Sequence, residues 1–119
     1  PLYIYKKPQL EKPAASEEEK PREFSLSQNF PNPFNMQTTI QYYVAGMKNN
    51  GERVNVELIV YNSLGQKIRT LVNGAVPPGN YAQVWDSRDD SGRDVSSGHY
   101  FYKLTASDFR ASKKMILMK

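Results

Sequence analysis

The residues of this chain that could act in catalysis lie close together. His99 is the only histidine, and Asp94 and Ser97 precede it by a few positions. These residue types suggest a nucleophile, a base and an orienting acid. The partners of a catalytic triad normally converge from separate elements, and residues this close in sequence cannot easily adopt that geometry. We therefore expect no enzyme activity and interpret His99 as a surface residue at the start of a strand.

A polar loop at residues 86–94, DSRDDSGRD, is the candidate metal site. Its four carboxylates belong to Asp86, Asp89, Asp90 and Asp94. Calcium takes oxygen ligands from such loops. The spacing does not follow the D-x-[DN]-x-[DN]-G pattern, and Arg88 and Arg93 would neutralise the site. Calcium is therefore the less favoured interpretation, Asx turns are the favoured one, and no other cofactor is expected.

Aromatic side chains could form a platform for sugar rings. The candidates are Tyr42, Tyr43, Tyr81, Tyr100, Phe101 and Tyr102. Strands also favour aromatic residues, so we interpret them as core and rim packing, with a carbohydrate-binding accessory module as a third, weaker function. Basic residues between aromatics would also suit single-stranded nucleic acid. Glu52, Glu57 and the acidic loop interrupt any continuous patch, and the net charge is only +4, so no nucleic-acid partner is expected.

The composition describes one small domain with a tail. A chain of 119 residues buries only a modest core. It contains no run of about 18 apolar residues, so no membrane span is expected. The absence of cysteine excludes disulfides and thiolate chemistry. The chain begins at Pro1 rather than Met, which suggests a processed protein or an excised C-terminal piece.

The stretch from Val54 to Val72 is the predicted centre of the fold. It alternates apolar and polar residues, breaks at Asn62–Gly65 and then resumes, which predicts a β-hairpin. The residues expected to face the core are Val54, Val56, Leu58 and Val60. Asn55 and Glu57 are expected on the opposite face.

Further strands are predicted on both sides of this hairpin. They are 38–44, a strand through Tyr81 and Trp85, 99–106 and 111–119, after a first irregular strand with anchors at Phe24, Leu26, Phe30 and Phe34. Asn50-Gly51 is predicted to close a hairpin leading into the central one, and residues 77–80 a tight turn. Trp85 is a candidate for the buried centre of the core. About seven short strands predict an all-β, immunoglobulin-like antiparallel β-sandwich over residues 24–119.

Residues 1–23 differ from the rest of the chain. They are rich in Pro, Lys and Glu, so they are predicted to form an extended linker. A short apolar stretch at its start could be added to a sheet as a strand, on the same chain or on a neighbouring copy. This stretch consists of Leu2, Tyr3, Ile4 and Tyr5.

Four motifs occur in a fixed order: FSLSQNFPNPFN, LIVYNSLGQKIRTLV, PPGNYAQVWDSRDDSGRDVSSGHYFYKL and KKMILMK. Together they resemble the C-terminal sorting domain of proteins exported by the type IX secretion system of Bacteroidetes-like bacteria. The immunoglobulin-like domain of the flagellar hook-capping protein is related in pattern. The family usually has Pro at the position of Met36 and Gly at that of Ser87.

The resemblance implies a non-catalytic address that the outer-membrane secretion machinery recognises. The cargo would pass through the periplasm to the cell surface or medium, and be released or attached to lipopolysaccharide. The recognition residues carried over are Gly98, Tyr100, Tyr102, Leu104, Lys113, Lys114 and Lys119. An open edge on the last hairpin would let a partner read its backbone. The alternative is a structural subunit of an extracellular filament or cap, which contacts neighbouring copies or other surface proteins through strand addition.

Overall fold

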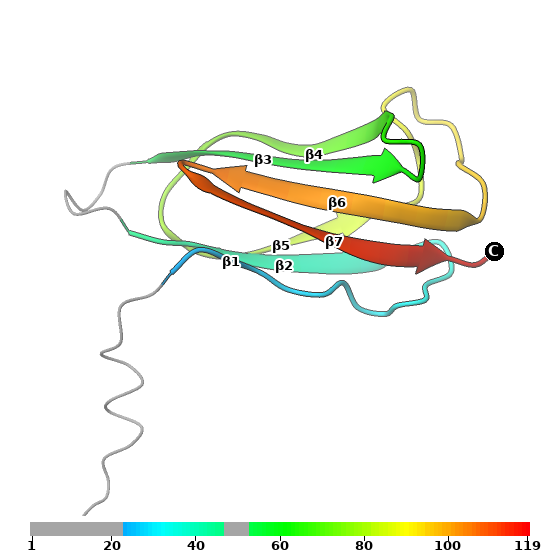
Figure 1. Ribbon diagram of the computed structural model, residues 1–119, viewed down its shortest axis with the longest axis horizontal. Helices are drawn as coiled ribbons and strands as arrows, with labels where there is room; N and C mark the ends of the chain where they lie inside the picture. Colours follow the sequence, from blue (N-terminus) through cyan, green and yellow to red (C-terminus); the bar gives the residue numbers. More distant parts are fainter. Residues whose placement is uncertain (1–22, 47–52) are drawn as a thin grey trace, which may run out of the picture.

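Two antiparallel β-sheets pack face to face in the computed structural model, which describes residues 23–46 and 53–119 (Figure 1). One sheet has the order β1 (Ser25–Leu26), β2 (Thr38–Val44), β5 (Gly79–Trp85). The other has the order β4 (Lys67–Val76), β3 (Val54–Asn62), β6 (Gly98–Ala106), β7 (Phe109–Leu117). The predicted seven-stranded, immunoglobulin-like β-sandwich is thereby confirmed for the described residues. Within those residues no helix is long and apolar enough to cross a bilayer.

The central hairpin forms as its alternation predicts. β3 pairs with β4 on one side and with β6 on the other, so it lies in the interior of the four-stranded sheet. Its inward residues Val54, Val56, Leu58 and Val60 are buried, whereas Asn55 and Glu57 are exposed. The side chain of Asn62 accepts hydrogen bonds from the backbone N–H groups of Leu64 and Gln66, which holds the turn. Local sequence therefore specifies both the strand pair and the face that it buries.

Two predicted turns are wrong, because the strands on either side of each one belong to different sheets. β2 and β3 belong to different sheets, so they do not form the predicted hairpin, and Asn50-Gly51 lies outside the described residues. Residues 77–80 are not a tight turn, because Pro77 and Pro78 carry the chain from β4 to β5 in the other sheet and Gly79 already belongs to β5. A proline has no N–H for a ladder, so it ends a strand without specifying which sheet the chain joins next.

The N-terminal segment follows its prediction only in part. Leu26 and Phe34 are buried, and the ring of Phe24 stacks on that of Phe109 at a centroid distance of 5.6 Å. Phe30 is wrong as an anchor, because its side chain is 78% exposed. Asn29 takes the inward position instead.

The buried Asn29 side chain donates hydrogen bonds to the Pro31 carbonyl oxygen and the Thr38 hydroxyl, at 3.1 and 2.9 Å. The hydroxyl of Thr38 donates in turn to the same carbonyl oxygen at 2.8 Å. This small polar network satisfies backbone and side-chain groups that could not otherwise be buried. The predicted tail strand at residues 2–5, and with it the filament alternative, lies outside the described residues.

Trp85 lies at the centre of the core, as the sequence suggests. Its side chain is fully buried at the end of β5, and its ring contacts those of Phe34 and Tyr100 at centroid distances of 5.8 and 5.3 Å. Its indole N–H donates to the carbonyl oxygen of Arg88 at 2.9 Å. One residue thus joins the three-stranded sheet, the N-terminal segment and β6.

Trp85→Ala should lower the free energy of unfolding by about 3–5 kcal/mol, because it leaves a large cavity between the sheets. Urea unfolding followed by far-UV circular dichroism measures this change. Val84→Ala, at the exposed neighbouring position, is the control and should change stability by less than about 1 kcal/mol. Equal losses for both variants would contradict the central place of Trp85.

Candidate recognition surface

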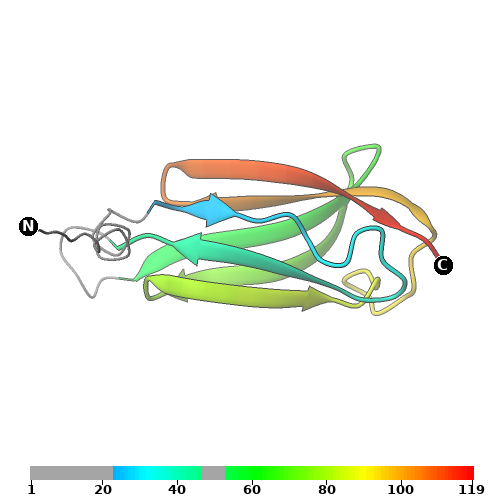
Figure 2. The same cartoon turned by 90° about the horizontal axis from the view of Figure 1, so that it is seen from below.

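The first and last parts of the domain meet along the edge of β7. The backbone N–H of Phe34 donates to Ile116 O, and the N–H of Met118 donates to Phe34 O, at 3.0 and 2.8 Å. The Gln28 side chain donates to the carbonyl oxygen of Lys114, and Asn32 Oδ1 accepts from the N–H of Ile116. Figure 2 shows the segment that follows β1 running beside β7.

This contact changes the expectation for the last hairpin. A partner was expected to read the open backbone edge of β7. Residues 28–34 already occupy the outward backbone groups of Lys114, Ile116 and Met118, so this half of the edge is closed to strand addition. Periodicity could not predict the contact, because the segment is irregular and distant in sequence.

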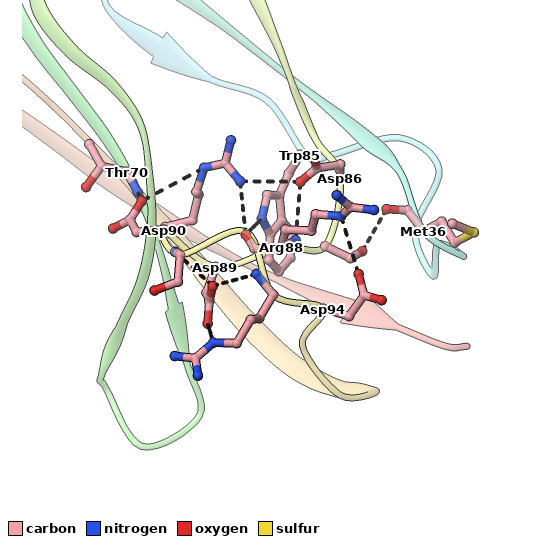
Figure 3. A network of polar contacts seen from close by, with 12 residues as sticks. Met36, Thr70, Trp85, Asp86, Arg88, Asp89, Asp90 and Asp94 are labelled. Carbon is pink, nitrogen blue, oxygen red and sulfur yellow. Dashed lines mark hydrogen bonds and ion pairs between the residues drawn. The ribbon is translucent and has the colours of Figure 1, made fainter.

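A shallow pocket of about 260 Å³ lies where the chain ends. It is lined by Asn35, Met36, Asp86, Ser87, Asp94 and Lys119. Met36 and Ser87 have positive φ angles of 80° and 65°, and the Ser87 hydroxyl donates to the Met36 carbonyl oxygen at 2.7 Å (Figure 3). These are the two departures from the family pattern. A proline could not adopt the φ of Met36, whereas the usual glycine would suit that of Ser87 without strain.

The acidic loop covers part of the opposite edge of the four-stranded sheet, that of β4 (Figure 3). The N–H of Asp90 donates to Ile68 O, and its carboxylate accepts from the N–H of Thr70 at 3.0 Å. Arg69 reaches from β4 to Asp86 at 3.4 Å and to Asp90 at 3.9 Å. The loop is therefore held on the four-stranded sheet although it follows a strand of the other sheet.

The four candidate calcium ligands are each engaged by the protein itself. Asp94 pairs with Arg88 at 3.4 Å, and Asp89 pairs with Arg93 at 3.7 Å. The N–H groups of Arg93 and Ser91 also donate to Asp89 Oδ1, and the bond from Arg93 is the largest cause that lowers the pKa of Asp89. Among the described residues no three acidic, histidine or cysteine side chains are placed to hold a metal ion. The geometry is that of the favoured Asx-turn interpretation.

The predicted recognition residues separate into two groups. Tyr100, Tyr102 and Leu104 are buried in the core, where they build the sandwich and cannot touch a partner of the folded domain. Lys114 and Lys119 are exposed, while Gly98 and Lys113 are half-buried.

Sequence reasoning missed the exposed apolar residues near Lys119. Met36 and Met118 are both largely exposed. Met36 lines the pocket beside Lys119, and the backbone of Met118 is bonded to Phe34. Met36 stood out in the sequence only as a departure from the family pattern, and Met118 only as part of the last strand, so neither signal indicated exposure.

Buried tyrosine hydroxyls tie strands to loops. Tyr102 donates to the carbonyl oxygen of Ser27 at 2.6 Å and so joins β6 to the N-terminal segment, and Tyr100 donates to that of Ser96 at 2.6 Å. Burial raises the pKa of Tyr102 to about 12. Tyr42 is also buried and stacks on Tyr81. The aromatic residues considered as a sugar platform are therefore divided between the core and the surface, in line with the favoured packing interpretation.

Two of the three residues with catalytic chemistry interact with residues outside the triad. Ser97 Oγ accepts from the N–H of Lys119 at 3.0 Å, and Asp94 pairs with Arg88. His99 is exposed on β6. The structure therefore does not bring them together as a triad.

A family model described as the FlgD Ig-like domain matches residues 38–109, which is more than half of the chain. The chain belongs to the FlgD Ig-like domain family. The match runs from β2 through β6 to the first residue of β7, so it includes Trp85 and the acidic loop of this FlgD Ig-like domain. No curated protein matches the chain.

Solved structures with a similar fold occur in larger proteins. Dimeric latent PorU from Porphyromonas gingivalis is 20% identical with a TM-score of 0.61, over 82% of this chain and 10% of PorU. The Pseudomonas fluorescens alkylpurine DNA glycosylase AlkC, bound to DNA containing an abasic site analog, is 14% identical with a TM-score of 0.52, over 82% and 31%. PorZ, a surface component of the type-IX secretion system of Porphyromonas gingivalis, is 17% identical with a TM-score of 0.47, over 81% and 11%. This chain thus spans about a tenth of PorU, and at these identities the likeness concerns the fold alone.

Asp90→Ala should lower the free energy of unfolding by about 1 kcal/mol, because the N–H of Thr70 loses its acceptor and Arg69 loses a carboxylate. Urea unfolding measures the loss. Arg93→Ala is the matched control, since it removes only an exposed ion pair of the same loop and should cost less than about 0.5 kcal/mol. Losses of the same size would show that the loop is not held through Asp90.

The raised pKa of Tyr102 predicts a loss of stability in alkali. The unfolded chain releases this proton near the ordinary pKa of 10.0, whereas the folded domain keeps it until about 12, so rising pH favours unfolding across that window. Urea unfolding at pH 9 and pH 11 tests this. Tyr102→Phe should cost about 1 kcal/mol at neutral pH through the lost hydrogen bond, yet lose less stability than the wild type on going to alkali. An unchanged alkaline loss in the variant would contradict the assignment.

Proposed function

We propose that this domain is a non-catalytic C-terminal sorting module of the type IX secretion system. It directs an attached protein through the periplasm and across the outer membrane to the cell surface or the medium. The outer-membrane secretion machinery is its partner, and lipopolysaccharide is the attachment point after processing. The order of the four motifs and the membership in the FlgD Ig-like domain family support this function.

The observation that carries the proposal is the meeting of two motifs from opposite ends of the domain. FPNPFN and KKMILMK are joined by paired backbone hydrogen bonds between Phe34 and residues 116 and 118. The resemblance to sorting domains implies that the secretion machinery recognises the folded module. A surface assembled from both ends of the domain exists only when the whole sandwich is folded. A partner that binds this surface therefore recognises only the folded domain.

The exposed part of this surface provides the recognition chemistry. Met36 and Met118 present flexible apolar side chains, which suit an adaptable protein contact. Lys119 adds a positive charge beside them, and it lines the pocket with Asp86 and Asp94. The buried tyrosines and Leu104 support recognition indirectly, through the fold.

A reporter fused before Pro1 of the full chain, in a bacterium that has a type IX system, tests the proposal. Removal of residues 113–119 should leave the reporter in the periplasm, but this change also removes the core residues Met115 and Leu117. The decisive variant is therefore Met118→Asp combined with Lys119→Glu, which alters only exposed side chains. Surface delivery should fall about tenfold, which corresponds to about 1.4 kcal/mol of lost recognition.

Asp108→Lys is the control variant, because Asp108 is exposed in the turn between β6 and β7, at the other end of β7 from Met118. It should be delivered like the wild type. Circular dichroism of each purified domain must show the same thermal transition. Normal delivery of the Met118/Lys119 variant would refute recognition through this surface, and normal delivery of the truncated chain would refute the sorting function.

A further inference from the structure

The two outer faces of the sandwich have different chemistry. Strands β1, β2 and β5 contain no charged residue. The four strands of the other sheet carry several, and Glu57 is the only acidic residue among them. The basic residues of the described strands therefore all lie on one sheet, which the formal net charge of +4 does not reveal.

One row of this sheet combines basic and aromatic side chains. The register aligns Lys67 of β4 with Tyr61 of β3, Tyr61 with Phe101 of β6, and Phe101 with Lys114 of β7. Cross-strand partners point to the same face of a sheet. Phe101, Lys67 and Lys114 are exposed and Tyr61 is half-exposed, so this is the outer face. Two rings therefore lie side by side between two lysines.

Two further cations extend this row along β6 and β7. Lys103 lies two residues after Phe101, and Arg110 lies on the same face of β7 as Lys114. Lys103 pairs with Ser112, which lies two residues from both Lys114 and Arg110. With strands about 4.8 Å apart and a rise of about 3.4 Å per residue, the backbone of Lys103 is roughly 8 Å from that of each of these residues. We call this surface, formed by Tyr61, Lys67, Phe101, Lys103, Arg110 and Lys114, the basic face.

The charges of the basic face are not used by the domain itself. None of its four cations forms an ion pair with another residue in the described part of the chain. By contrast, Arg69, Arg88 and Arg93 all pair with aspartates of the acidic loop. The basic face therefore keeps its positive potential available to an anionic partner.

We propose that the basic face binds an acidic polysaccharide, a chain of sugar rings that carry carboxylates. The exposed ring of Phe101 and the neighbouring ring of Tyr61 provide apolar faces on which sugar rings stack, with the Tyr61 hydroxyl as a polar group. The surrounding lysines and Arg110 pair with the carboxylates on either side of the stacked rings. Two adjacent rings with a lysine on either side match a polymer whose sugar rings carry carboxylates at their edges.

Other anionic polymers fit this face less well. Nucleic acid binding relies on a continuous positive groove along the phosphates, whereas Glu57 lies on the same face beside Thr105 and Arg110. An acidic polypeptide that adds as a strand would need the free edge of β7, and residues 28–34 close half of it. The proposed binding is independent of export, because it uses the outer face of the sheet rather than the end that carries Met118 and Lys119.

Titration of the full chain with oligogalacturonate, followed by amide NMR shifts and calorimetry, tests this proposal. Oligogalacturonate should bind and shift the amides of residues 61, 101, 103 and 114, while neutral dextran should not bind. Affinity should fall as salt is raised, because exposed charge pairs are screened. Absence of binding at low salt would overturn the proposal.

Variants in β6 and β7 test whether binding depends on the basic face or only on the positive charge of the domain as a whole. Lys103→Gln with Lys114→Gln should weaken oligogalacturonate binding roughly fivefold, and Phe101→Ala roughly threefold. Lys113→Gln is the matched control, because Lys113 is adjacent in β7 but points to the other side of the sheet, and it should bind like the wild type. An equal loss for Lys113→Gln would overturn the assignment to this face. Tighter binding of oligothymidylate or polyglutamate than of oligogalacturonate would assign the face to nucleic acid or acidic protein and would overturn the polysaccharide.

Discussion

The buried indole of Trp85 is the interaction on which the rest of the structure depends. Its ring fills the space between the sheets, and its N–H must find an acceptor because no water reaches it there. The acceptor is the carbonyl oxygen of Arg88, three residues further along the chain. The start of the acidic loop is thereby fixed to the core. The same oxygen accepts a hydrogen bond from Arg69 at 3.2 Å, so β4 is tied to the same point.

The same arrangement covers part of the exposed strand edges. A β-sandwich leaves unpaired backbone groups at the sides of its sheets, and these groups invite pairing with other chains. In this domain the acidic loop covers part of β4, and residues 28–34 cover the second half of β7. Both covering segments end at the pocket beside Lys119. Protection of the edges and construction of the candidate recognition surface are therefore two results of the same contacts.

The two proposed activities use different parts of one rigid scaffold. The proposed recognition during export uses the end where Met36, Met118 and Lys119 lie, and this surface requires the complete fold. Polysaccharide binding depends on the outer face of the four-stranded sheet, where the register alone places rings between cations. In this proposal, an exported domain with both surfaces is first bound by a protein partner and then binds an acidic polysaccharide outside the cell.

The sequence by itself determined which segments form strands and which side chains they bury. The alternation in β3 predicted its inward residues, because a period of two places every second side chain on one face. Trp85 was recognisable as a core candidate for its size, and the Asx turns expected in the acidic loop are present at Asp86 and Asp89. The order of motifs indicated a type IX sorting domain related in pattern to the FlgD Ig-like domain, and the match over residues 38–109 shows the second of these families.

Only the tertiary structure decided which strands form each sheet and how residues 28–34 contact the end of β7. The predicted turn signals at Asn50-Gly51 and at prolines 77 and 78 indicate where a strand ends, but they do not state whether the next strand joins the same sheet. The exposure of Phe30, the inward place of Asn29 and the closure of β7 depend on contacts between residues far apart in sequence. Such contacts follow from the packing of complete sheets, and no local pattern of residue types contains that information.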